Sequence, residues 1–255
     1  MDLNFLKFEE FNIIADGLNP SYQADQYCQT ALNTVPSPYL PRQRTEPLPS
    51  ASLTFLSGPT PAHFINSLQS PAIGIIEWND ETPDLLQRVA FLAHYQVIGF
   101  SVTSMTAAQF KLSQLLCDGI KSHFKASDQA IMAIELTLHE AIINALAHGN
   151  LELGSAFQET NDDLQLYYKK VGEKAVDPKF KNRRIDIFAW SIESSILIAI
   201  KDDGNGYKWP GPTQAITAPE YDRRKSGRGL DILRQFTHDY WVSEKGNCTV
   251  LKLTK

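Results

Sequence analysis

The sequence predicts an α/β protein, in which helices pack against a mixed β-sheet. Between residues 53 and 102, short apolar runs typical of strands alternate with segments of helical periodicity, an order typical of a partly parallel sheet. Two amphipathic helical segments follow, and four more strand-like runs come after them. We expect a smaller α/β region at residues 1–96, followed by a two-layer α/β sandwich at residues 97–255.

The composition is that of an ordinary globular protein, and it excludes several classes. Of the 255 residues, 43% are hydrophobic and 21% charged, and the net charge of -5 argues against nucleic acid as a partner. The three cysteines have no CxxC spacing, which favours a reducing compartment. The first residues lack the positive charge of a signal peptide, and no apolar run approaches the ~20 residues of a membrane span. We therefore expect a cytoplasmic protein that does not contact membranes.

The first half of the chain contains a proline-rich stretch and then a regular alternation of elements. Six of the fourteen prolines lie between residues 20 and 50, so a long loop is expected there. The elements expected next are a strand at 53–56, a helix at 61–68, a strand at 72–78, a helix at 82–94 with Thr82 as N-cap, and a strand at 95–102.

This N-terminal alternation invites comparison with a receiver domain, which needs a phospho-accepting Asp and an acidic cluster at strand ends. Only Glu77, Asp80 and Glu81 lie near one strand end. A degenerate receiver-like unit or an unrelated docking unit is therefore favoured over a functional receiver.

The C-terminal part starts with two predicted helices. Residues 106–124 form the first, and Ser127 is placed to cap the second at residues 128–149. After a polar stretch at 155–181, the expected elements are a hairpin of strands 184–190 and 195–201, a helix at 229–236, and closing strands at 239–243 and 249–253.

The helix at 128–149 has two stripes. Ile131, Ile134, Leu138, Ile142 and Ala145 form an apolar stripe, and Glu140, Asn144 and His148 recur every fourth residue on another side. A solvated polar face is the ordinary interpretation of such a stripe. An Asn oxygen can, however, ligate Mg²⁺, and a carboxylate one turn away can act as a base. The helix alone leaves both interpretations open.

Two glycine-rich segments follow. The segment DDGNG at residues 202–206 directly follows an apolar strand, and its alternate glycines permit a tight turn or close approach to a ligand. The segment RRKSGRGL at residues 223–230 places two glycines and four basic residues before a predicted helix, a pattern typical of a phosphate cradle. Each segment is also compatible with an ordinary surface turn or loop.

The order of these segments is more specific than any one of them. A Glu…Asn helix, a strand ending in DxGxG, a GxG before a helix and a final strand starting with Thr together resemble the GHKL (Bergerat-fold) ATPase superfamily. The string EAIINALAHGN at residues 140–150 is similar to the N-box of serine-kinase anti-sigma factors in particular. The resemblance covers residues 97–255. Its bacterial relatives carry such a domain behind a receiver or other regulatory module, and no recognisable receiver precedes it here.

The resemblance implies a role for each matching residue, with ATP and Mg²⁺ as cofactors. Asn144 would ligate Mg²⁺, Glu140 would be the general base, and Asp202 would bind the adenine amine with Thr249 beside it. Residues 207–226 would form a mobile lid. The full set of implied nucleotide contacts is Asn144, His148, Asp202, Gly204, Gly206, Gly227, Arg228, Gly229, Leu230 and Thr249.

Three functions follow from the resemblance. The leading hypothesis is an anti-sigma-factor-type protein serine/threonine kinase that binds and phosphorylates a regulatory partner, either an antagonist protein or a sigma factor. The alternative is a catalytically inactive, nucleotide-gated binding module. A sensor histidine kinase would need a phospho-accepting His on a dimerisation hairpin, which none of the six histidines provides. Homodimers are common among these relatives.

Overall fold

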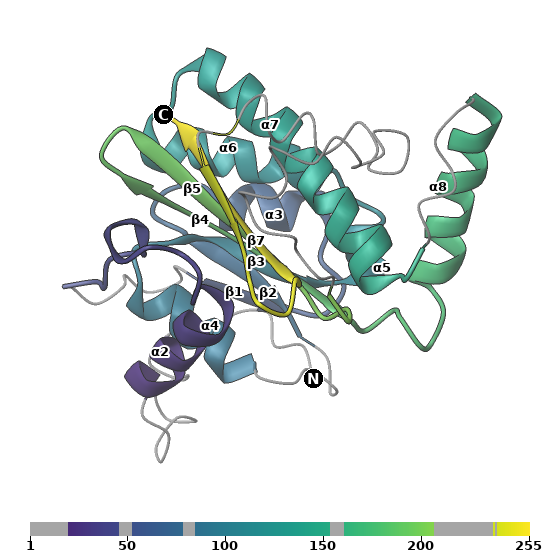
Figure 1. Cartoon of the computed structure of the whole chain (residues 1–255), viewed down its shortest axis with the longest axis horizontal. Helices are drawn as coiled ribbons and strands as arrows, with labels where there is room; N and C mark the ends of the chain where they lie inside the picture. Colours follow the sequence, from purple (N-terminus) through teal and green to yellow (C-terminus); the bar gives the residue numbers. More distant parts are fainter. Residues whose placement is uncertain (1–19, 46–52, 79–84, 154–160, 207–236, 238) are drawn as a thin grey trace, which may run out of the picture.

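A seven-stranded mixed sheet organises the protein (Figure 1). The computed structural model describes residues 20–45, 53–78, 85–153, 161–206, 237 and 239–255. The strand order is β1-β2-β3-β4-β5-β7-β6, with β1, β2 and β3 parallel and the later neighbours antiparallel. The strands are β1 Leu53–Leu56, β2 Gly74–Glu77, β3 Ile98–Thr103, β4 Arg184–Ile192, β5 Ser195–Asp202, β6 Asp239–Val242 and β7 Cys248–Thr254. The α/β class is confirmed.

Helices cover both faces of the sheet (Figure 1). They are α2 Pro20–Ala31, α3 Pro61–Ser67, α4 Leu85–His94, α5 Ser104–Ala107, α6 Leu112–Phe124, α7 Asp128–Ile143 and α8 Asn161–Ala175, with a 3₁₀ turn η1 at Ser37–Tyr39 and a π-helix η2 at Asn144–Asn150. Helices α3, α6 and α7 lie on one face. Helices α2 and α4 lie on the opposite face, where Tyr27 and Phe91 pack against Phe188. This second helical layer adds to the two layers expected from the sequence.

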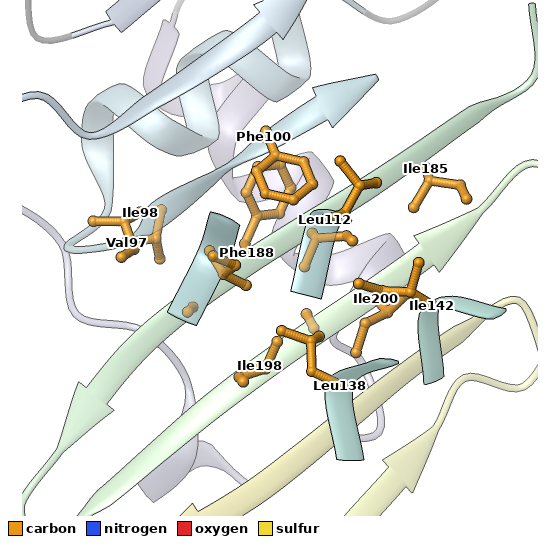
Figure 2. Packing of buried hydrophobic residues seen from close by; sticks show 14 of the residues in the cluster. Val97, Ile98, Phe100, Leu112, Leu138, Ile142, Ile185, Phe188, Ile198 and Ile200 are labelled. Atoms are coloured by element: carbon orange, nitrogen blue, oxygen red, sulfur yellow. The ribbon is translucent and has the colours of Figure 1, made fainter. Parts of the chain in front are cut away.

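Part of the hydrophobic core lies between α7 and the sheet (Figure 2). Leu138 and Ile142 of α7 lie beside Ile198 and Ile200 of β5, and all four are buried. The apolar stripe predicted for this helix is therefore the face that packs on the sheet. Ser127 caps the helix as predicted, because its hydroxyl accepts a hydrogen bond from the backbone N–H of Ala130 at 3.2 Å.

The continuous helix Asp128–Asn150 is long and apolar enough to cross a membrane by length and composition. In the fold it is the core helix just described, since Ile134, Leu138 and Leu146 are buried within the domain. Its apolar stripe packs against the sheet, while Met132 and Leu136 of the same helix are exposed.

Three sequence expectations about elements outside the helix at 128–149 were wrong. The expected loop at residues 20–50 begins instead with α2, in which Tyr27 and Ala31 are buried one turn apart; Pro20 is its first residue, where proline is tolerated. The single helix expected at 106–124 is divided into α5 and α6. The polar stretch at 155–181 contains α8, whose buried residues Val171 and Ala175 are again one turn apart.

The acidic residue considered for a receiver site has a structural role. The Glu77 carboxylate accepts hydrogen bonds from the backbone N–H and hydroxyl of Thr103, at 2.7 and 3.1 Å, and from the hydroxyl of Thr106 at 2.8 Å. Glu77 thus stabilises the first turn of α5, next to the N-cap Thr103. Asp80 and Glu81 lie outside the described residues.

The sheet is continuous across the expected boundary at residue 96. Strand β2 pairs with β3 from Gly74↔Gly99 to Ile76↔Ser101, and β3 pairs with β4 along its full length. The N-terminal α/β region and the C-terminal part therefore share main-chain hydrogen bonds.

Candidate nucleotide-binding site

Glu140 and Asn144 lie one turn apart at the C-terminal end of α7, and both are half-buried. Burial raises the pKa of the Glu140 carboxyl, while the charges of His139 and His148 and a hydrogen bond from the Asn144 side chain oppose this rise. Because the amide of Asn144 donates to the carboxylate, its oxygen is the atom that can ligate a cation.

The helix widens from Asn144 onward. Residues Asn144–Asn150 form a π-helix, in which the N–H of Leu151 bonds to the carbonyl of Leu146 at 2.8 Å. The sequence predicted a continuous α-helix here, and that expectation was wrong. π-Helical turns occur frequently at functional sites. Because a π-turn contains more residues than an α-turn, side chains four residues apart no longer point in the same direction.

His148 lies within this π-helix. Its Nδ1 lies 2.7 Å from the carbonyl oxygen of Leu153, and the side chain is exposed. Because a carbonyl can only accept, Nδ1 carries the proton, and in the neutral ring Nε2 is then an acceptor. Its expected contact with the nucleotide is a proposal.

Asn150 ends the π-helix and connects it to the sheet. Its side chain is fully buried and donates to the Ser104 hydroxyl at 3.0 Å and to the Arg184 carbonyl at 2.9 Å. Its Oδ1 accepts from the backbone N–H of Asp203 at 2.9 Å. The last residue of the N-box therefore fixes the helix against the first glycine-rich segment.

Asp202 ends β5 on the face of the sheet covered by α7. It is 6% exposed, and burial raises the pKa of its carboxyl to about 7, although the Gly204 N–H, which donates to Oδ1 at 2.8 Å, opposes the rise. The backbone of Asp202 is held by Asn247, whose carbonyl and side-chain amide both bond to it at 2.9 Å. The structure thus presents a buried carboxyl next to the end of the N-box helix.

The glycines near Asp202 permit close approach of three backbone segments. A Cβ atom on Gly149 would lie 2.5 Å from the Asp202 carboxyl, and one on Gly204 would lie 2.3 Å from the carbonyl oxygen of Gly149. Gly206 has φ of +72°, and a Cβ there would lie 1.9 Å from the carbonyl oxygen of Lys245. The alternate glycines therefore allow the segment to pass between the N-box and the β6–β7 turn.

Thr249 lies on the same face as Asp202. It pairs with Ile200, which precedes Asp202 by two residues and so shares its face of the sheet. The structure thus places Asp202 and Gly204 against Gly149, in the π-helix that continues the helix of Glu140 and Asn144, with Thr249 on the neighbouring strand β7. The predicted phosphate contacts Gly227, Arg228, Gly229 and Leu230, the helix at 229–236 and the lid at 207–226 lie outside the described residues.

Sequence reasoning missed several residues at this site. Asp203 appeared only as part of a turn, although its carboxylate accepts from the Arg184 N–H at 2.8 Å. Tyr167 of α8 lies near Glu140, and burial followed by the Glu140 charge raises its pKa to about 12. The spacing of Tyr167, Val171 and Ala175 was the signal that could have revealed α8.

The comparison with known families agrees with this geometry. Residues 104–255, more than half of the chain, match the family model of the histidine kinase-like ATPase domain. The chain therefore belongs to this family, a GHKL-type ATP-binding module. A search of curated proteins found no match.

Two features of this chain lie outside what the family match alone describes. In this chain an N-terminal α/β region precedes the ATP-binding domain, and its strands β1 and β2 extend the same sheet. Among the described residues, no group of three His, Cys, Asp or Glu side chains could hold a metal ion.

Proposed function

We propose that this protein is an ATP- and Mg²⁺-dependent protein serine/threonine kinase of the anti-sigma-factor type, acting in the bacterial cytoplasm on a regulatory partner protein. The observation that supports this most directly is the half-buried Glu140, with a raised pKa, one turn before Asn144. A protein that only bound nucleotide would have no need of a base at this position.

The proposed reaction transfers the γ-phosphoryl group of ATP to a hydroxyl of the partner. The hydroxyl oxygen bonds to the γ-phosphorus, the bond from that phosphorus to the β–γ bridging oxygen breaks, and ADP leaves. Glu140 accepts the proton of the hydroxyl. A carboxylate whose pKa is raised by burial is a stronger base than one in water.

The other residues would bind and orient the substrate. Asn144 would hold Mg²⁺, which supplies charge neutralisation at the phosphates. Asp202 would accept a hydrogen bond from the adenine amine, with Thr249 beside it, and residues 227–230 would contact the phosphates. We propose a regulatory or docking role for residues 1–96, and a homodimer as the working assembly.

The kinase proposal is tested by incubating the protein with candidate partner proteins and ATP labelled at the γ-phosphate. Acid-stable label on serine or threonine of the partner is expected, because phosphate esters survive acid. Acid-labile label would indicate histidine phosphorylation and contradict the proposal. Tight ATP binding without transfer would favour the nucleotide-gated binding module instead.

Replacing Asn144 with Ala is expected to weaken Mg-ATP binding by about tenfold or more and to remove most of its dependence on magnesium, because a metal ligand is lost. Titration calorimetry with and without magnesium measures both effects. Gln129→Ala, near the opposite end of the same helix, is the control and should bind like the wild type. Equal magnesium dependence in the wild type and Asn144→Ala would show that the metal lies elsewhere.

Binding of Mg-ADP is expected to release a proton near neutral pH. The pKa of Asp202 is about 7 without nucleotide, and an amine that donates to the carboxylate lowers it, so about half a proton leaves at pH 7 and almost none at pH 9. Affinity should accordingly rise as the pH rises through this range. Calorimetry in buffers of different ionisation enthalpy measures the proton, and an equal release at both pH values would contradict the role of Asp202.

A further inference from the structure

A buried cluster of charges connects the N-terminal helices to the first glycine-rich segment. Arg88 of α4 donates from Nε to both carboxylate oxygens of Asp186 of β4, at 2.8 and 3.0 Å, and both residues are almost fully buried. Asp186 also accepts from the hydroxyls of Ser101 and Tyr27. Burial disfavours its charge, but Arg88, Lys201 and Arg184 more than compensate and hold its pKa below the usual range.

Asp203 joins this cluster to the nucleotide site. Its Oδ1 lies 3.7 Å from a terminal nitrogen of Arg88 and 3.7 Å from Nζ of Lys201. Its Oδ2 accepts from the Arg184 N–H at 2.8 Å, and its own N–H donates to Asn150 at 2.9 Å. Asp203 therefore contacts α4, β4, β5 and the end of the π-helix.

The position of Asp203 in the chain couples the two faces of the sheet. Asp203 lies between Asp202, whose side chain is on the α7 face, and Gly204, whose N–H bonds to the Asp202 carboxyl. The carboxylate of Asp203 meets Arg88 on the α4 face. Because consecutive residues share peptide planes, a shift of Asp203 also moves Asp202 and Gly204.

We propose that Asp203 is a positioning residue of the ATP site and that Arg88 connects it to the N-terminal region. The layer formed by helices α2 and α4 would in this way set the affinity for nucleotide. This inference rests on the placement of adenine at Asp202 proposed above. The N-terminal region thereby completes the ATP site, and a partner or signal that displaces α4 would change nucleotide affinity through this contact.

The variant Asp203→Asn tests the first part. The amide oxygen can still accept from the Arg184 N–H, but the charge that pairs with Arg88 and Lys201 is lost. We expect affinities for Mg-ATP and Mg-ADP to fall together by about five- to tenfold, because the adenine end of the site is displaced. Glu193→Gln removes an exposed carboxylate at the opposite end of the same hairpin and serves as the control.

A double-mutant cycle tests the connection. Arg88→Lys keeps a positive charge but shortens the reach towards Asp203, and it should weaken nucleotide binding by a similar factor. If the two residues act through one contact, the double variant binds no more weakly than the weaker single variant. Should Arg88→Lys not fold, Arg88→Gln combined with Asp186→Asn removes both charges of the buried pair and takes its place.

Titration calorimetry well below the melting temperature separates positioning from stability. Lower melting temperatures with unchanged affinities would overturn the proposal, and so would effects that simply add in the double variant. Failure of the wild type to bind nucleotide would overturn the proposed function as well. Normal binding by the wild type and by every variant would overturn only the positioning role.

Discussion

Glu140→Gln is expected to abolish phosphoryl transfer while Mg-ATP still binds. Glutamine has nearly the same shape, but it cannot accept the proton of the attacking hydroxyl. Loss of a general base lowers rates by about 10²–10⁴-fold, whereas affinity for Mg-ATP should stay within about twofold. Transfer to the partner gives the rate and calorimetry gives the affinity. The two measurements together distinguish a base from a binding residue.

The control for this experiment is Glu135→Gln, which removes a carboxylate from the same helix. It should leave both transfer and binding unchanged. If Glu140→Gln instead prevented nucleotide binding, the carboxylate would be a binding group and its assignment as the base would be wrong. Retained transfer would equally exclude Glu140 as the base.

The sequence was sufficient for the parts of the fold that depend on local pattern. The stripe containing Leu138 and Ile142 predicted the buried face of α7, and Ser127 predicted its start. The alternation of apolar runs predicted the parallel strands β1, β2 and β3. Each of these signals lies within a short stretch of the sequence, so it could be interpreted without knowledge of distant contacts.

The sequence was not sufficient where distant contacts decide the structure. The π-helix at Asn144–Asn150 is accompanied by contacts of Asn150 with Ser104, Arg184 and Asp203, all remote in the chain. Helix α2 was hidden by the prolines that follow it, and its Tyr27 is stabilised by Asp186 from a strand 159 residues away. Arg88 gave no sign in the sequence of its contact with the glycine-rich segment.

Gly204→Ala is expected to lower the free energy of unfolding by about 1–3 kcal/mol and to weaken Mg-ATP binding by more than about tenfold. A Cβ atom at this position would lie 2.3 Å from the carbonyl oxygen of Gly149 and 2.7 Å from Oδ1 of Asp202. The first neighbour is main chain of the N-box helix and the second is the carboxyl proposed to bind adenine, so relief of the clash must displace one of them.

Gly172→Ala is the matched control, because a Cβ atom on Gly172 of α8 meets no atom within 4 Å. Alanine is more stable than glycine in a helix interior. The free energy of unfolding of this variant should therefore rise by about 0.5–1 kcal/mol, and nucleotide binding should be normal. Chemical denaturation and calorimetry on the two variants give the comparison. If Gly204→Ala matched Gly172→Ala in both measurements, the close approach of the glycine-rich segment to the N-box would be dispensable. If Gly204→Ala binds Mg-ATP more weakly even under conditions where the variant is fully folded, this close approach shapes the adenine end of the site.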